Sequence, residues 1–175
     1  VKVADLSEWW QGQKNIVLLD PNLLACKEHI GLLEQLETSK AWVDFTQGLD
    51  ARLLTEDNIN ALNKVKTKML HFAWDLMNES EKVIRGLELY AKHGAIPDVR
   101  KRRVYVLCNY NTTMEENLYR VYKLKELQYD PYVMIYDKPH APKEIKRLQR
   151  WVNNKYIFRS CERFEDYQAE IERGF

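Results

Sequence analysis

The chain has 175 residues, the usual size of one folded domain with a buried core. Its 27 Lys and Arg residues nearly balance its 26 Asp and Glu residues, and the net charge of +1 gives no global field that would attract nucleic acid or an anionic membrane. A hydrophobic share of 45% argues against disorder, and no apolar run reaches the length of a membrane span.

Five short apolar runs, rich in β-branched and aromatic residues, are typical of buried strands. They are residues 16–19, 42–45, 69–74, 104–108 and 132–136. A segment with the apolar spacing of a helix follows each run. The stripes are Ile30, Leu33 and Leu36; Ile59, Leu62 and Val65; Val83, Leu87 and Tyr90; Leu118, Val121, Leu124 and Leu127; and Ile145, Leu148 and Val152.

Local signals mark three helix ends. Gly94 predicts the end of the third helix, and Pro142 lies near the expected start of the fifth. Thr113 and Glu116 have the spacing of a capping box, which predicts the start of the fourth helix. Uninterrupted alternation of strands and helices predicts an α/β fold with a parallel sheet. No linker-like stretch divides the chain, and we expect residues 1–175 to form a single domain.

Polar residues follow every predicted strand. They are Asp20 and Asn22; Gln47 and Asp50; Asp75 and Asn78; Asn109 and Asn111; and Asp137 and Lys138. In parallel α/β folds the carboxyl ends of the strands share one rim, where ligands bind. Asp and Asn are also common caps and turn residues, and we expect that structural role for Asn78 and Asn111. Gln47 is a poor cap, which favours a binding role.

Two polar residues fall inside predicted strands, Asp44 and His71. An unpaired polar group in a dry core costs roughly 2–7 kcal/mol. A sheet that curls so that one face lines a wet cavity avoids this cost. Strand alternation places His71, Ala73 and Asp75 on one face, opposite larger apolar residues, as a barrel lumen requires. The alternative is a filled core in which Asp44 and His71 bond to each other or to the backbone.

Several familiar sites are missing from the sequence, namely the dinucleotide and phosphate glycine loops and the GxSxG elbow of acyl transfer. The four histidines lack zinc spacing. Three widely spaced cysteines, Cys26, Cys108 and Cys161, indicate a reducing, cytoplasmic compartment. The basic run at residues 100–103 is typical of a solvated loop leading into a strand, although it offers phosphate contacts for an RNA-binding alternative.

Several stretches resemble the radical SAM superfamily, and within it a bacterial group of Fe–S oxidoreductases. The most specific is Gln-Gly-Leu-Asp-Ala-Arg at residues 47–52, and the likeness extends through residues 16–25, 72–75, 104–109, 130–137 and 150–154. The resemblance covers nearly the whole chain. It implies an open partial TIM barrel. It also implies a [4Fe–4S] cluster on a CxxxCxxC loop and S-adenosylmethionine as the source of a 5′-deoxyadenosyl radical.

The chain departs from this family at the cluster, because it contains no CxxxCxxC motif. The five predicted strands match the second to sixth strands of the family. The first strand and the cluster loop would then precede Val1, and this chain would be the C-terminal part of the barrel, inactive alone. The cluster would belong to the full-length protein only, and the present chain is expected to hold no metal.

By position in the family, five residues are expected to bind S-adenosylmethionine: Asp20, Asn22, Gln47, Asp75 and Asn109. Asp20 and Asn22 stand in place of the family's Gly-Gly-Glu type motif, which meets the amino group of the cofactor. Asp75 matches the ribose contact, and Asn109 the adenine or methionyl contact. Gln47 would touch cofactor or substrate. The resemblance names neither the substrate nor a catalytic residue.

The sequence therefore predicts the S-adenosylmethionine- and substrate-binding part of a radical SAM oxidoreductase. One alternative is a non-catalytic α/β module that binds a nucleotide-like ligand or a partner, and another is an RNA-binding domain. A missing first strand would leave the edge at residues 16–19 unpaired. We expect that edge either to pair with a second copy of the chain or to be covered by residues 1–10, which include Trp9 and Trp10.

Overall fold

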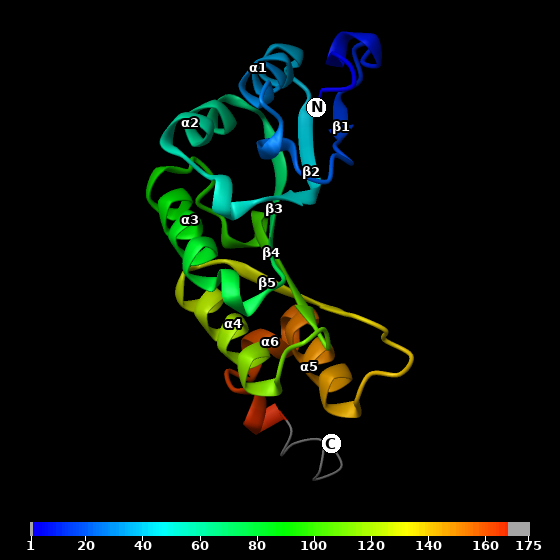
Figure 1. The fold of residues 1–175 in the computed structure, drawn as a ribbon, viewed down its shortest axis with the longest axis vertical. Coiled ribbons are helices and arrows are strands. Elements are labelled where there is room, and N and C mark those ends of the chain that lie inside the picture. Colours follow the sequence, from blue (N-terminus) through cyan, green and yellow to red (C-terminus); the bar gives the residue numbers. More distant parts are fainter. Residues whose placement is uncertain (1, 168–175) are drawn as a thin grey trace.

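The computed structural model describes residues 2–167 and has an α/β fold built on one five-stranded sheet (Figure 1). The strands are β1 (Asn15–Val17), β2 (Trp42–Leu49), β3 (Thr67–Trp74), β4 (Arg102–Cys108) and β5 (Asp130–Ile135). The helices are α1 (His29–Ser39), α2 (Glu56–Lys64), α3 (Ser80–His93), α4 (Met114–Glu126), α5 (Lys143–Asn153) and α6 (Lys155–Ser160). Short 3-10 turns are η1 (Leu6–Glu8), η2 (Leu23–Ala25), η3 (Ala51–Leu53), η4 (Met77–Glu79) and η5 (Val99–Lys101).

All strand pairs are parallel, and the strands lie in the sheet in the order in which they occur in the chain. Helices α1 to α4 run along one side of the sheet, while its other face carries no helical layer over β1 to β4 from the described residues (Figure 1). This is the arrangement of an open partial barrel, and the predicted fold class is confirmed. No helix within residues 2–167 has the length and apolar character needed to cross a membrane.

The sheet has two chemically different faces because successive side chains point in opposite directions. On β3, Leu70, Phe72 and Trp74 are buried against the helices, whereas Ala73 on the other face is only partly covered. The same alternation buries Val104 and Val106 of β4. The core therefore lies between the helices and one face of the sheet.

The helix ends follow the signals in the sequence. The Thr113 hydroxyl accepts a hydrogen bond from Glu116 N at 3.2 Å, and the Glu116 carboxylate accepts one from Thr113 N at 2.8 Å. Gly94 caps the end of α3, and Pro142 precedes α5. The second strand is longer than predicted: it reaches Leu49 and includes Gln47, which we expected after the strand.

The two edges of the sheet differ in how their backbone is satisfied. Asn153 and Gln149 of α5 bond to the free backbone groups of Val133 at 2.8–3.1 Å, so α5 protects the β5 edge. Residues 2–10 do not cover the β1 edge, contrary to one of the two expectations from the sequence. They pack on α1, where Gln35 bonds to Leu6 N and to Asp5, and Trp9 is 75% exposed. Pairing of β1 with a second copy stays a prediction.

The basic run at residues 100–103 is not a simple solvated loop. Arg102 is buried at the start of β4, where it donates to the Gln128 carbonyl at 2.8 Å and lies over the ring of Tyr129. Arg103 pairs with Asp130 at 3.1 Å. Strand alternation turns Arg102 toward the core side. The expectation of a solvated loop was therefore wrong for Arg102 and Arg103, which have a structural role.

Candidate functional site

A cavity of about 260 Å³ opens at the carboxyl ends of β1, β2 and β3. Its walls come from the loop after β1, the end of β2 with η3, and the end of β3 with η4 and the start of α3. The lining residues are Pro21, Asn22, Gln47, Gly48, Leu49, Asp50, Arg52, Ala73, Asp75, Leu76, Glu79 and Val83. This is the rim at which parallel α/β folds bind ligands.

Three of the five predicted site residues meet in this cavity: Asn22, Gln47 and Asp75. An irregularity in the pairing of β2 with β3 between Phe45 and Leu49 contributes to this arrangement. Within it, Gly48 has φ +90°, a conformation that side chains with a Cβ rarely adopt. Glycine at this position therefore shapes the cavity wall.

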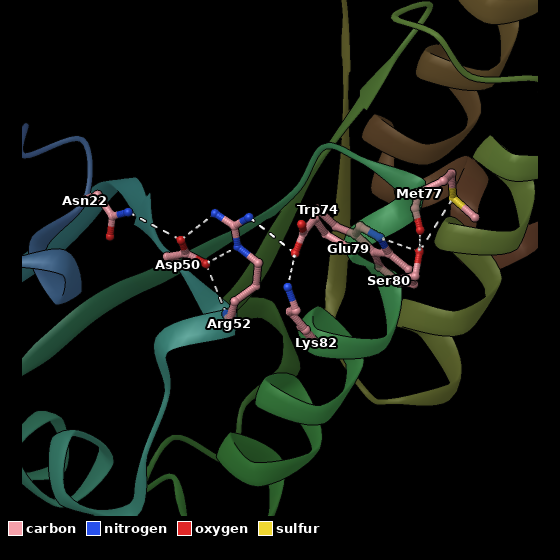
Figure 2. Close-up of polar contacts among 8 residues, drawn as sticks. All are labelled: Asn22, Asp50, Arg52, Trp74, Met77, Glu79, Ser80 and Lys82. Carbon is pink, nitrogen blue, oxygen red and sulfur yellow. Dashed lines mark hydrogen bonds and ion pairs between the residues drawn. The ribbon is translucent and has the colours of Figure 1, made fainter.

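A row of linked polar side chains runs from Asn22 to Lys82 (Figure 2), and most of its members line the cavity. The guanidinium of Arg52 binds both carboxylate oxygens of Asp50, at 2.8 and 2.7 Å, and Asn22 Nδ2 donates to the same carboxylate at 3.3 Å. Arg52 also lies 3.6 Å from Glu79, which pairs with Lys82 at 3.3 Å. Hydrogen bonding from Arg52 lowers the pKa of Asp50, so Asp50 is ionised at neutral pH.

Asp75 differs from Asp50 because its carboxylate has no hydrogen-bond or ion-pair partner within residues 2–167. The carboxylate is open to solvent on the cavity side. The protein packed around it raises its pKa, while the charges of Arg120 and Arg52 act in the opposite direction. An acceptor atom of Asn22, its Oδ1, is buried and has no hydrogen-bond partner in the described part of the chain. The cavity thus offers unused hydrogen-bond acceptors.

The other two predicted residues lie outside this cavity. Asp20 is next to it and accepts a hydrogen bond from Asn22 N at 2.9 Å, which shapes the loop after β1. Asn109 follows β4, has φ 63° and donates to the Tyr136 carbonyl at 2.9 Å. Asn109 therefore joins the loops after β4 and β5, and does not line the cavity with the others.

His71 is buried, although it lies on the face of the sheet without helices. Its ring stacks on Tyr105 at 5.1 Å, and Nδ1 lies 3.2 Å from the Phe45 carbonyl and 3.6 Å from Asp44. Burial lowers the pKa of His71, against the effect of Asp44. The alternative of a filled core in which these polar groups bond to each other or to the backbone describes His71 better than a wet lumen does, because its ring bonds to the Phe45 carbonyl.

The residues present do not fit an iron–sulfur cluster. Within residues 2–167 no three His, Cys, Asp or Glu side chains are arranged to hold a metal ion. Cys26, Cys108 and Cys161 are buried, and none forms a disulfide in this part of the chain. Burial raises the pKa of the Cys108 thiol to about 11, which disfavours the thiolate form that ligates metals.

Sequence reasoning missed Arg52 and Glu79 as parts of the site. Arg52 lies two residues after Asp50, the spacing at which an Asp side chain bonds the following turn, and this local signal could have been read. Glu79 is brought to Arg52 only by the packing of α3 against η3, which no local pattern reveals.

The lining has three carboxylates, Asp50, Asp75 and Glu79, and one cation, Arg52. This charge balance favours a ligand with positive charge or several hydrogen-bond donors. Comparison with known proteins adds no relative: no model of a protein family matches the chain, and neither the curated proteins nor the solved structures give a match.

Proposed function

We propose that the cavity at the ends of β1–β3 binds S-adenosylmethionine, as part of a radical SAM oxidoreductase. The observation that carries the proposal is the unpartnered carboxylate of Asp75, facing a cavity whose lining has more acidic than basic groups. Such a wall attracts a ligand that combines a sulfonium, an ammonium and two ribose hydroxyls.

The lining groups match the parts of this ligand in chemical type. Asp75 and the orphan acceptor of Asn22 are suited to N–H and O–H donors. Asp50 is already engaged by Arg52, which leaves Asp75 as the carboxylate available to the ligand. Gln47 is exposed at the mouth and offers both an amide donor and an acceptor.

In this proposal the cofactor supplies radical chemistry, and the residues of this chain bind and orient it. The described residues supply no site for the cluster. Because Arg102 is buried and Arg103 is ion-paired with Asp130, the RNA-binding alternative has fewer exposed, unpaired positive charges than the sequence indicated. The alternative of a non-catalytic module that binds a nucleotide-like ligand would use the same cavity, without radical chemistry.

Calorimetric titration of S-adenosylmethionine into the wild type and Asp75→Asn tests the proposal. Asn is close in shape to Asp, but it removes the negative charge and replaces one acceptor oxygen with an amide donor. Loss of a charged hydrogen bond should weaken binding about tenfold, equivalent to ~1.4 kcal/mol. Asp137→Asn is the matched control, because Asp137 follows β5 and does not line the cavity. It should bind like the wild type.

S-adenosylhomocysteine sharpens the test because it lacks the sulfonium charge. If the acidic wall selects for positive charge, Asp75→Asn should reduce the preference for S-adenosylmethionine over S-adenosylhomocysteine. Equal affinities of wild type and Asp75→Asn for S-adenosylmethionine, or no binding to the wild type, would overturn the proposal.

A further inference from the structure

Arg120 of α4 is a buried cation that bonds mainly to backbone. Its side chain is fully buried, and its two terminal nitrogens donate to three carbonyls, those of Trp74 at 2.7 Å, Asp75 at 3.2 Å and Leu107 at 2.8 Å. A fourth bond, at 2.6 Å, goes to Asn117 Oδ1 on the same helix. Arg120 therefore ties the end of β3 to the end of β4.

Burying an arginine in this way costs free energy of folding. A guanidinium stays protonated in proteins, and a buried ion loses several kcal/mol of hydration. Among residues 2–167, none of the hydrogen-bond partners of Arg120 is a carboxylate, and its Nε is buried without a partner. Backbone carbonyls alone leave its positive charge uncompensated by any ion pair.

The charge of Arg120 lies next to a residue that lines the cavity, Asp75. Asp75 is attached through its own carbonyl to Arg120, and the two charges attract each other. The other charged groups that act on Asp75 are Arg52, which favours its ionised form, and Asp50, which opposes it. The protein packed around Asp75 raises the pKa of its carboxyl and so favours the neutral acid, which binds a cation poorly, and the charge of Arg120 acts against this effect.

We infer that Arg120 is a positioning residue of this cavity. It fixes the backbone at Asp75 and keeps a positive charge next to that residue, so that the carboxylate meets a cationic ligand as an ordered anion. The ligand part of the inference rests on the proposed function, whereas the action of Arg120 on Asp75 does not.

The test compares Arg120→Met with Arg102→Met. Arg102 is the matched control, because it is also buried and also bonds a backbone carbonyl, but at the opposite end of β4. Both variants should lose stability. Only Arg120→Met should raise the pKa of the Asp75 carboxyl further, measured by carbon-13 NMR with the signal assigned through Asp75→Asn. The affinity for S-adenosylmethionine near neutral pH should fall about tenfold in Arg120→Met alone.

Arg120→Lys keeps the charge with a different hydrogen-bond geometry, and provides a second variant if Arg120→Met does not fold. In Arg120→Lys the pKa of Asp75 should stay close to that of the wild type, while hydrogen exchange at the ends of β3 and β4 becomes faster. An Asp75 pKa that is the same in wild type and Arg120→Met, or that rises as much in Arg102→Met, would overturn the inference. If the wild type binds no S-adenosylmethionine, the proposed function fails, and the NMR titration still decides the role of Arg120.

Discussion

The two halves of the sheet's carboxyl edge use similar residues in different ways. At the ends of β1–β3, Asn22 and Asp75 line a cavity and keep hydrogen-bond acceptors unused. At the ends of β4 and β5, Asn109 bonds to the Tyr136 carbonyl, and Asp137 bonds to His140 at 2.9 Å. Within residues 2–167, one half keeps acceptor atoms unpaired beside a cavity, while the side chains of the other half bond to their own loops.

Backbone conformation accompanies this difference. Asn109, Asn111 and Asp137 all have positive φ angles, between 47° and 63°, in which Asn and Asp are the side chains best tolerated after glycine. In the cavity half the positive φ belongs to Gly48. Asn and Asp after a strand therefore need not line a cavity, because the turn can itself require them.

The largest effect is expected from Gly86→Ala, which would break the wall of the cavity half. A Cβ at Gly86 of α3 would lie 1.8 Å from the carbonyl oxygen of Ala51 in η3. The backbone that carries Arg52 must then shift. We expect the free energy of unfolding, measured with urea, to fall by about 3 kcal/mol.

Gly31→Ala is the control for this change, because a Cβ at Gly31 in α1 meets nothing within 4 Å. It should stabilise the protein by about 0.5–1 kcal/mol through helix propensity. Similar unfolding free energies for the two alanine variants would show that α3 and η3 are not in such close contact.

A smaller effect is expected in the other half. Asn109→Ala places alanine in the left-handed region and removes the bond to Tyr136, which should cost about 1–2 kcal/mol of stability. Asn109→Gly removes the same bond without the backbone strain and should lose less. Neither change should alter S-adenosylmethionine binding, measured by calorimetry. Weaker binding in both would assign Asn109 to the site after all.

The smallest effect concerns the stability of Asp75→Asn. Because the pKa of Asp75 is raised in the folded protein, the folded state holds the proton more tightly than the unfolded state. Stability is therefore lost as pH rises from the unfolded pKa through the folded one. Asp75→Asn should be slightly more stable than the wild type at pH 7, and this advantage should disappear at pH 3, by urea unfolding. A variant that is less stable at pH 7 would contradict the raised pKa.

Local sequence signals predicted the fold better than the site. Capping at Thr113 and the alternation around Phe72 depend on neighbours in the chain, and both are confirmed. The burial of Arg120 and the approach of Glu79 to Arg52 depend on contacts between segments far apart in the sequence. The prediction for Asn109 assumed that every strand end joins one mouth, but its left-handed turn directs it to Tyr136.

A crystal structure of the chain soaked with S-adenosylmethionine tests the central claim most directly. We expect the ligand in the cavity at the ends of β1–β3, with a ribose hydroxyl or the amino group within hydrogen-bond distance of the Asp75 carboxylate. Ligand bound instead beside Asn109 and Tyr136, with the cavity at Asp75 containing only solvent, would contradict it.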